Sequence, residues 1–166
     1  MSSSFELHEV ELITTGAIGP PGQRVFYLQV RHPGGVVSLR LEKAQVAALC
    51  RYLDEMLEDL PAVEAVPADM DLAEPVVAEW VVGSLGVTYD EEDERFLLVA
   101  EEMVDEDEPP ARALIRATTA QMAAFTRHGS TVVASGRPPC PLCGGPLDPD
   151  GHMCVRLNGH RDLGGR

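Results

Sequence analysis

Two segments of this chain carry the same residues at a constant spacing of 76 positions, and this repeat constrains the fold more than any other feature. Each segment follows three strand-like stretches and has an alanine-rich helical pattern. The repeat indicates an internal duplication in which each half is a β-β-β-α unit. Chance similarity between two amphipathic helices is the alternative explanation. The recurring residues are Arg40, Ala44, Gln45, Ala47, Ala48 and Arg51, which return as Arg116, Ala120, Gln121, Ala123, Ala124 and Arg127.

Apolar residues at helical spacing predict the first helix, which Pro61 ends. In the second half, Gly129 and Ser130 favour a loop by propensity alone. The repeat instead places Val132 and Val133 on the apolar helix face, so we predict a helix from Thr118 to about Ala134. Thr118 and Gln121 have the spacing of a capping box at its start. The apolar face of the first helix comprises Val46, Leu49, Cys50, Leu53, Met56, Leu57 and Leu60.

Alternation of apolar and polar residues predicts three strands in each half, at 5–15, 24–31 and 36–41, and at 80–89, 95–102 and 111–117. Residues 16–22 have the composition of a turn. Two acidic runs, 90–94 and 105–110, are typical of solvated hairpin loops. We therefore expect an α+β domain over residues 1–135, with halves at about 5–60 and 79–135 and a linker at 61–78. We expect its antiparallel strands to pack on the two helices. The sequence leaves open whether these strands form one sheet, a barrel or a sandwich.

The C-terminal part of the chain, residues 136–166, has the pattern of a small zinc knuckle. Cys140 and Cys143 form a Cys-x-x-Cys pair, and Gly144 permits the sharp turn that such a pair needs. His152 and Cys154 are two positions apart, so in an extended segment both side chains point to the same side. Three thiolates and an imidazole form the closed tetrahedral set of structural zinc. We predict Zn²⁺ on Cys140, Cys143, His152 and Cys154, with His160 as the alternative fourth ligand.

A disulfide or redox pair is the competing interpretation of Cys140 and Cys143. Redox Cys-x-x-Cys motifs normally open a helix after a strand. Here Pro141, Gly144 and Gly145 surround the pair, and no helical pattern follows. These neighbours favour the metal site.

The stretch from Gly136 to Cys154, with Asn158-Gly159 after it, resembles an actinobacterial family catalogued only as domain of unknown function 3090. The segments 21–29 and 41–46 are also similar to that family, so the resemblance spans most of the chain. In the family, Pro-Arg usually follows the third cysteine and Tyr usually stands at the position of His160. This chain has Val155-Arg156 and His160, which favours His152 as the ligand. The resemblance implies no reaction.

Charge and composition narrow the possible partners. The chain has 27 acidic and 13 basic residues, a net charge of −14, which argues against a nucleic-acid surface and against an anionic membrane surface. The first residues lack the pattern of a signal peptide, and no apolar run has the length of a membrane span. Clustered cysteines suit a reducing compartment, so we expect a cytoplasmic protein. Cys50, alone on a helix face, is expected to be a small core residue.

No catalytic constellation is evident in the sequence, which has no nucleophile elbow, Walker loop or dinucleotide fingerprint. His8, His32 and His128 are scattered and are expected at the surface or with satisfied hydrogen bonds. Arg40 and Arg116 stand at matched positions of the repeat. They are expected to pair with carboxylates, and anion binding across a pseudo-twofold axis is the alternative.

The leading functional hypothesis is a non-catalytic accessory or interaction protein with a structural zinc site. Its partner is expected to be another protein, and its oligomeric state stays open. The alternative is an enzyme or a sensor of a small ligand or anion that uses a cleft between the two halves. An open coordination position on the zinc ion would favour the alternative, and four protein ligands favour the first hypothesis.

Overall fold

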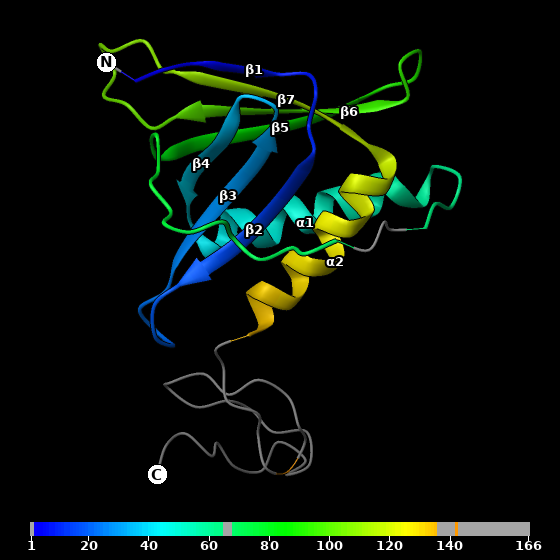
Figure 1. Ribbon diagram of the computed structural model, residues 1–166, viewed down its shortest axis with the longest axis horizontal. Helices are drawn as coiled ribbons and strands as arrows, with labels where there is room; N and C mark the ends of the chain where they lie inside the picture. Colours follow the sequence, from blue (N-terminus) through cyan, green and yellow to red (C-terminus); the bar gives the residue numbers. More distant parts are fainter. Residues whose placement is uncertain (1, 65–67, 136–141, 143–166) are drawn as a thin grey trace. The chain divides into compact units, whose positions relative to one another are not determined.

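The computed structural model describes residues 2–64, 68–135 and 142 of this chain. Helices and strands are segregated along the sequence, and the predicted α+β class is confirmed (Figure 1). The elements, in chain order, are β1 (Phe5–Leu7), β2 (Leu12–Ile18), β3 (Val25–His32), β4 (Gly35–Leu41), α1 (Lys43–Glu58), β5 (Val82–Asp90), β6 (Arg95–Glu102), β7 (Arg112–Thr118) and α2 (Thr119–Ala134).

The strands form two sheets, with orders β2-β3-β4 and β1-β7-β6-β5. Their pairing is antiparallel throughout, except that β1 lies parallel to β7. The two sheets are joined at one point, where Arg40 of β4 and Val81 form an isolated parallel bridge. Around it, the Arg40 N–H donates to the Trp80 carbonyl at 3.1 Å, and the Glu79 N–H donates to the Ser38 carbonyl at 2.8 Å.

The single strand expected over residues 5–15 is two strands. β1 pairs with β7 in one sheet, whereas β2 pairs with β3 in the other. The chain must therefore leave its first sheet between Leu7 and Leu12. Local patterns cannot reveal this change, because the partner strands β7 and β3 lie elsewhere in the sequence.

The turn expected over residues 16–22 begins later, because Gly16 lies inside β2. A Cβ atom on Gly16 would meet Leu72 Cγ at 2.6 Å, so this glycine permits a close approach and does not bend the chain. The turn begins at Gly19, whose φ of 117° lies in the region that favours glycine.

The two sheets contain three-stranded ladders with the same register. Leu28 of β3 pairs with Thr15 and Leu39, and Leu98 of β6 pairs in the same way with Val87 and Ile115. Continuing these ladders makes Thr14, which pairs with Gln29, equivalent to Gly86, which pairs with Val99. In each half, the helix begins at or just after the end of the third strand.

Both helices begin with the same capping arrangement. The Glu42 N–H donates to Gln45 Oε1 at 2.7 Å, and the Thr118 N–H donates to Gln121 Oε1 at 2.9 Å. The Gln121 N–H returns a bond to Thr118 Oγ1 at 3.1 Å, which completes the predicted capping box. The predicted extension of the second helix to Ala134 is also confirmed.

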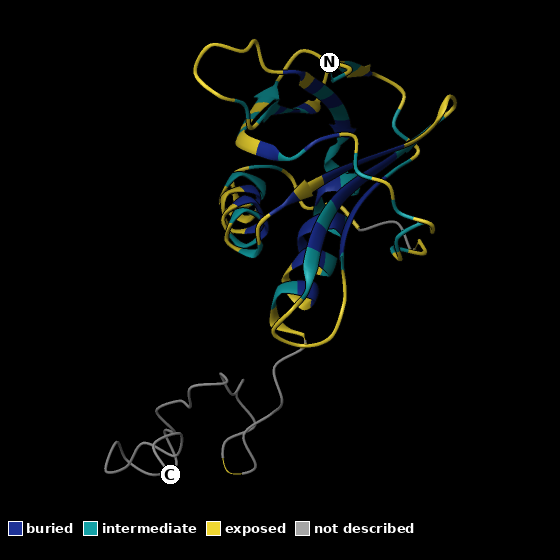
Figure 2. Cartoon of the chain, turned by 90° about the vertical axis from the view of Figure 1, so that its left-hand side faces the viewer, coloured by how far each residue is buried: buried dark blue, intermediate teal, exposed yellow. Residues whose placement is uncertain are grey.

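The hydrophobic core draws on both sheets and both helices, and Figure 2 shows its buried residues on the facing sides of these elements. Phe96, Leu53 and Met122 have no exposed surface. The helices approach closely at Gly129 of α2, where a Cβ atom would lie 2.5 Å from the Sγ atom of Cys50 on α1. Gly129 is therefore a contact residue, which explains a glycine inside a helix.

We expect Gly129→Ala to lower the free energy of unfolding by about 1–3 kcal/mol, because its new methyl group overpacks the contact with Cys50. Without this contact, alanine inside a helix would stabilise the protein by about 0.5–1 kcal/mol relative to glycine. Urea denaturation measures the change. The same substitution in a Cys50→Ala background should cost much less, because the Sγ atom is gone. A more stable single variant would contradict the prediction.

The segment between the halves, 61–78, packs on the outer face of the β2-β3-β4 sheet. The amide of buried Gln29 donates to the Ala73 carbonyl at 3.1 Å and accepts from the Ala73 N–H at 2.7 Å. Thr14 Oγ1 donates to the Met70 carbonyl at 2.5 Å, and Leu72 covers Gly16. The segment has no helix or strand of its own among its described residues, yet its backbone is bound by specific side chains.

The chain divides into two compact units, Met1–Ile18 with Val25–Val133, and Gly19–Arg24 with Ala134–Arg166. The first unit contains the two sheets and the core. In the second unit, the Arg24 guanidinium donates to the Ser135 carbonyl at 2.5 Å. The zinc knuckle predicted for 136–166 lies outside the described residues, apart from Leu142, so it stays a prediction.

Candidate functional site: the groove between α1 and β5

The residues predicted to bind zinc are not among those that the structure describes. They are Cys140, Cys143, His152, Cys154 and the alternative His160. Within residues 2–64, 68–135 and 142, no group of three or more His, Cys, Asp or Glu side chains is arranged to hold a metal ion.

The three histidines in the described part of the chain lie at or near the surface. His8 and His32 line a shallow hollow beside β1, and His8 Nε2 lies 3.7 Å from the Glu6 carboxylate. His32 Nδ1 accepts a hydrogen bond from the Gly34 N–H at 3.2 Å. His128 is half-buried on α2. These placements agree with the surface or satisfied roles expected for them.

The two matched arginines differ in their surroundings. Arg116 lies 2.9 Å from Asp93 and 3.8 Å from Asp90, which is the carboxylate pairing that the sequence predicted. Arg40 is exposed on β4, and its backbone N–H makes the bond to Trp80 that joins the sheets. The ion pairs of Arg116 tie the end of β5 and the acidic loop after it to β7 of the same sheet.

Cys50 is only 3% exposed, as expected for a core residue. Burial, followed by the charge of Asp54, raises the pKa of the Cys50 thiol to about 11. A thiol with such a pKa is almost fully protonated at neutral pH, so it is a poor nucleophile and a poor metal ligand. Cys50 therefore contributes packing.

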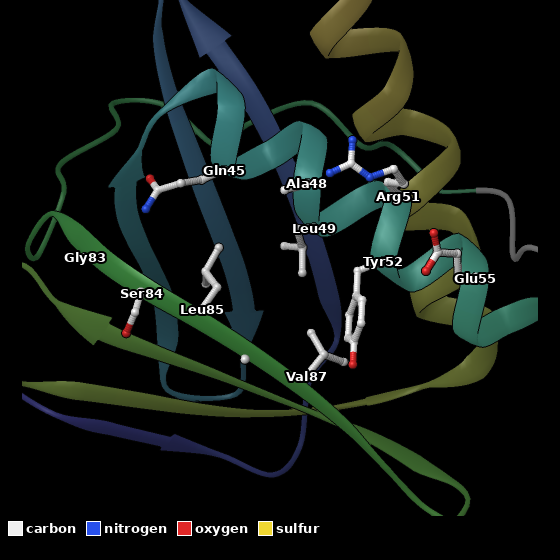
Figure 3. Close-up of a pocket in the computed structure, with 11 residues that line it drawn as sticks. Gln45, Ala48, Leu49, Arg51, Tyr52, Glu55, Gly83, Ser84, Leu85 and Val87 are labelled. Carbon is white, nitrogen blue, oxygen red and sulfur yellow. The ribbon is translucent and has the colours of Figure 1, made fainter.

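A groove of about 620 Å³ lies between α1 and β5 (Figure 3). One wall comes from the first half of the chain and the other from the second. Leu85 and Val87 of β5 point toward the helix, and the ring of Tyr52 reaches from the helix toward Val87, while Ser84 points away. The lining residues are Gln45, Ala48, Leu49, Arg51, Tyr52, Glu55, Gly83, Ser84, Leu85, Gly86 and Val87.

Gln45 fixes one end of the groove. Its Oε1 atom caps α1, and its Nε2 atom donates to the Val82 carbonyl at the start of β5, at 3.3 Å. One side chain therefore sets the position of the helix against the strand. At the other end, Tyr52 is 51% exposed, which is unusual for a large aromatic side chain next to apolar neighbours.

β5 presents an unpaired edge to this groove. β6 lies along one side of β5, and beyond the bridge at Val81 no other described strand pairs with the second side. An edge strand carries backbone N–H and C=O groups that are available to another polypeptide. The groove therefore has apolar side chains of β5 facing α1, and it lies beside a strand that has one paired side among the described strands.

The sequence profile described as "Protein of unknown function (DUF3090)" matches residues 5–154. The chain belongs to the DUF3090 family. The match covers both sheets and both helices, and it extends to Cys154, the last of the four predicted zinc ligands. Neither a curated protein nor a solved structure matches this DUF3090 chain. None of the helices in its described residues is long and apolar enough to cross a membrane.

Sequence reasoning anticipated a cleft between the halves but named no residue in it. Tyr52 was the available signal, because it is a large aromatic residue that falls off the apolar face of the first helix. Leu85 and Val87 read as an ordinary strand. Only the order of strands in the sheet shows that they lie on an edge.

Proposed function

We propose that this DUF3090 protein is a non-catalytic accessory protein that binds another polypeptide through the groove between α1 and β5. The observation that carries the proposal is the unpaired edge of β5 along that groove. An exposed strand edge is a template for strand addition, a common mode of peptide recognition. Proteins usually protect such edges, and here neither proline nor lysine stands between Gly83 and Asp90.

The side chains of the groove support binding of a polypeptide. Leu49, Leu85 and Val87 supply apolar surface, and the half-exposed Tyr52 offers an aromatic contact. Tyrosine is among the residues that contribute most to protein interfaces, because its large ring loses little conformational entropy on binding.

Binding through this groove is tested with an exposed helix position that lines it. Ala48→Trp would fill the groove, whereas Ala44→Trp places the same side chain on α1 at an exposed position outside the lining. In cross-linking followed by mass spectrometry in the native host, we expect Ala48→Trp to abolish the major cross-linked partner and Ala44→Trp to retain it. Equal loss or equal retention would contradict the proposal. Light scattering separates a second copy of the chain from a different partner.

We propose that the C-terminal residues hold one structural zinc ion on Cys140, Cys143, His152 and Cys154. The donor set suits closed tetrahedral coordination, which would staple a segment too short for its own core. Native mass spectrometry should detect one zinc per chain, lost in Cys143→Ser. His152→Ala should weaken zinc binding more than His160→Ala. The opposite order would make His160 the ligand, and a wild-type chain without zinc would contradict the site.

We also propose that the two halves, about 5–60 and 79–135, arose by internal duplication. The shared ladder register and the paired capping arrangements support it. The first segment of each half pairs with the third strand of the other half. β1 lies parallel to β7, and residues 79–81 lie parallel to β4. On this hypothesis the groove lies between the two repeats. The acidic charge and the clustered cysteines support a cytoplasmic location.

A second candidate is a sensor that binds a small ligand in the same groove. A volume of about 620 Å³ lies in the usual range for such sites, and Arg51 in the lining could meet an anion. The experiment with Ala48→Trp separates the two, because a small-ligand sensor would keep no groove-dependent protein cross-link.

A further inference from the structure

We infer that the outer face of the β1-β7-β6-β5 sheet, which is the face opposite the helices, binds one short, uncharged segment of a partner protein, whose apolar side chains pack on Leu97, Val99 and Leu114. This inference goes beyond the proposed function, because it concerns a different face of the molecule from the groove between α1 and β5. It comes from comparing the outer faces of the two sheets.

The outer faces of the two sheets correspond residue by residue, because their three-stranded ladders have the same register. In each half, one residue of the middle strand pairs with one residue on either side. The row in the first half is Thr14, Gln29 and Ser38, and its counterpart in the second half is Gly86, Val99 and Leu114. Ser38 and Leu114 are 76 positions apart, which is the spacing of the sequence repeat. The register and the repeat therefore agree on which residues correspond.

A segment of the chain itself covers this row in the first half. Thr14, Gln29 and Ser38 are polar, yet each is at most 3% exposed. The Thr14 hydroxyl and the Gln29 amide bind the backbone groups of Met70 and Ala73, which lie on this face. The first half therefore demonstrates that a single segment without helix or strand can serve as the outer layer of such a sheet.

The corresponding row in the second half is apolar and open to water. A Cβ atom on Gly86 would meet no atom within 4 Å, whereas a Cβ atom on Gly16 of β2 would meet Leu72 of the covering segment. Val99 and Leu114 are partly exposed, and so is Leu97, which lies on the same face of β6 as Val99. The second half thus leaves apolar side chains in water where the first half covers polar ones.

The charges beside this row are already paired, which selects an uncharged occupant. Arg116 of β7 lies 2.9 Å from the Asp93 carboxylate. Arg112 of β7 lies 2.7 Å from the Glu101 carboxylate. At the β1 border, the Glu6 side chain is 71% exposed, so an ion pair with it would contribute little. A charged group brought onto the row would lose its water without gaining a strong partner, whereas a neutral apolar segment complements the face.

A partner segment fits this face better than a second copy of the chain. Two copies with a net charge of −14 each repel one another as they approach. The apolar side chains also come from two neighbouring strands only, β6 and β7, so the row has the width of one segment and not of a second sheet.

The probe is a synthetic peptide of residues 68–75 with blocked ends, in which threonine replaces the three acidic residues. This segment covers the outer face in the first half, where the chain's own copy already occupies the site. The peptide is titrated into the full chain, and methyl NMR follows Leu97, Val99 and Leu114. We expect these three signals to shift. We also expect the neutral peptide to bind at least about tenfold tighter than the unsubstituted acidic peptide.

A paired variant tests the contact from the side of the protein. Val99→Gln with Leu114→Ser gives the face the polar pair found in the first half, and it should weaken binding of the neutral peptide at least about tenfold, because the apolar contact is lost. Ala44→Gln, at an exposed position of α1, should leave the binding unchanged. Circular dichroism verifies folding, and Leu114→Ser alone, with a loss of at least about threefold, replaces the pair if the pair does not fold.

The other outcomes contradict the inference. Absence of shifts at the three methyl-bearing residues would overturn binding at this face, and equal binding of the acidic peptide would overturn the selection for an uncharged segment. A dimer in light scattering that the paired variant dissociates would assign the face to a second copy. Cross-links within one chain, from a photoreactive residue at position 114 to residues beyond 135, would assign it to the chain itself. The proposed function survives each of these results, because its cross-link in the host depends on Ala48 of α1.

Discussion

Phe96→Ala should lower the free energy of unfolding by about 3–5 kcal/mol, the range for deleting a fully buried phenylalanine. Phe96 has no exposed surface and is the second residue of β6. Its ring meets Tyr89 edge-on, with centroids 5.0 Å apart and an interplanar angle of 65°, which adds a specific aromatic contact. Alanine would leave a cavity where both sheets and the helices meet. Chemical denaturation followed by circular dichroism measures the loss.

The neighbouring residue provides the control. Leu97 is next along β6 but points to the opposite face, where it is partly exposed. Leu97→Ala should therefore cost well under half as much as Phe96→Ala. Equal costs for the two variants would mean that the faces of β6 are assigned wrongly.

Gln29→Leu should lower the free energy of unfolding by about 2–4 kcal/mol, because it leaves several buried or half-buried polar groups without a partner. The Gln29 amide binds both backbone groups of Ala73 and donates to Ser38 Oγ at 3.1 Å. Leucine matches the size of glutamine but replaces none of these bonds. We expect residues 68–75 to detach and to become sensitive to a protease that cleaves at acidic residues, which mass spectrometry would detect.

Ser38→Ala is the matched control, because it removes only the hydrogen bond from Gln29 to the serine hydroxyl and keeps both bonds to Ala73. It should cost about 0.5–1.5 kcal/mol and leave residues 68–75 protected. If Gln29→Leu also left the segment protected, the hydrogen bonds to Ala73 would not be what holds it in place.

The experiments at the two grooves are connected. Ala68 and Met70 line a groove between α2 and β2, so detachment of residues 68–75 would enlarge that groove. The groove between α1 and β5 is lined by none of the residues 68–75 and not by Gln29. A peptide that binds at β5 through backbone pairing should therefore bind the Gln29→Leu protein there with unchanged affinity.

Local patterns predicted most elements of the fold. The 3.6-residue spacing of apolar residues gave α1, and the repeat corrected local propensity for α2, where Gly129 and Thr131 favour a loop. β6 was predicted with its observed ends, because charged residues flank a short apolar run. The boundary between β1 and β2 was missed, since pairing with β7 and β3 depends on residues far away in the sequence.

The candidate groove was harder to predict than the fold. The position of Tyr52 off the apolar face of the helix predicts that its side chain is exposed. The residues that face Tyr52 across the groove depend on how the strands pair, which the helix pattern does not show. Leu85 and Val87 line a groove only because β5 is the last strand of its sheet. The zinc ligands differ from the groove residues, because the spacing of the cysteines and histidines in the sequence is enough to predict them. These ligands lie outside the described residues, so the zinc site stays a prediction.

The sequence by itself determined both helices, most of the strands and the acidic charge, because each of these depends on neighbours within a few residues or on composition. The tertiary structure decided which strands share a sheet, that β1 crosses to the second half, and that residues 68–75 cover the first half only. It also decided that, among the described strands, β6 alone forms a ladder with β5. Pairing between distant strands is a competition among many possible partners, and only the packed core selects one of them.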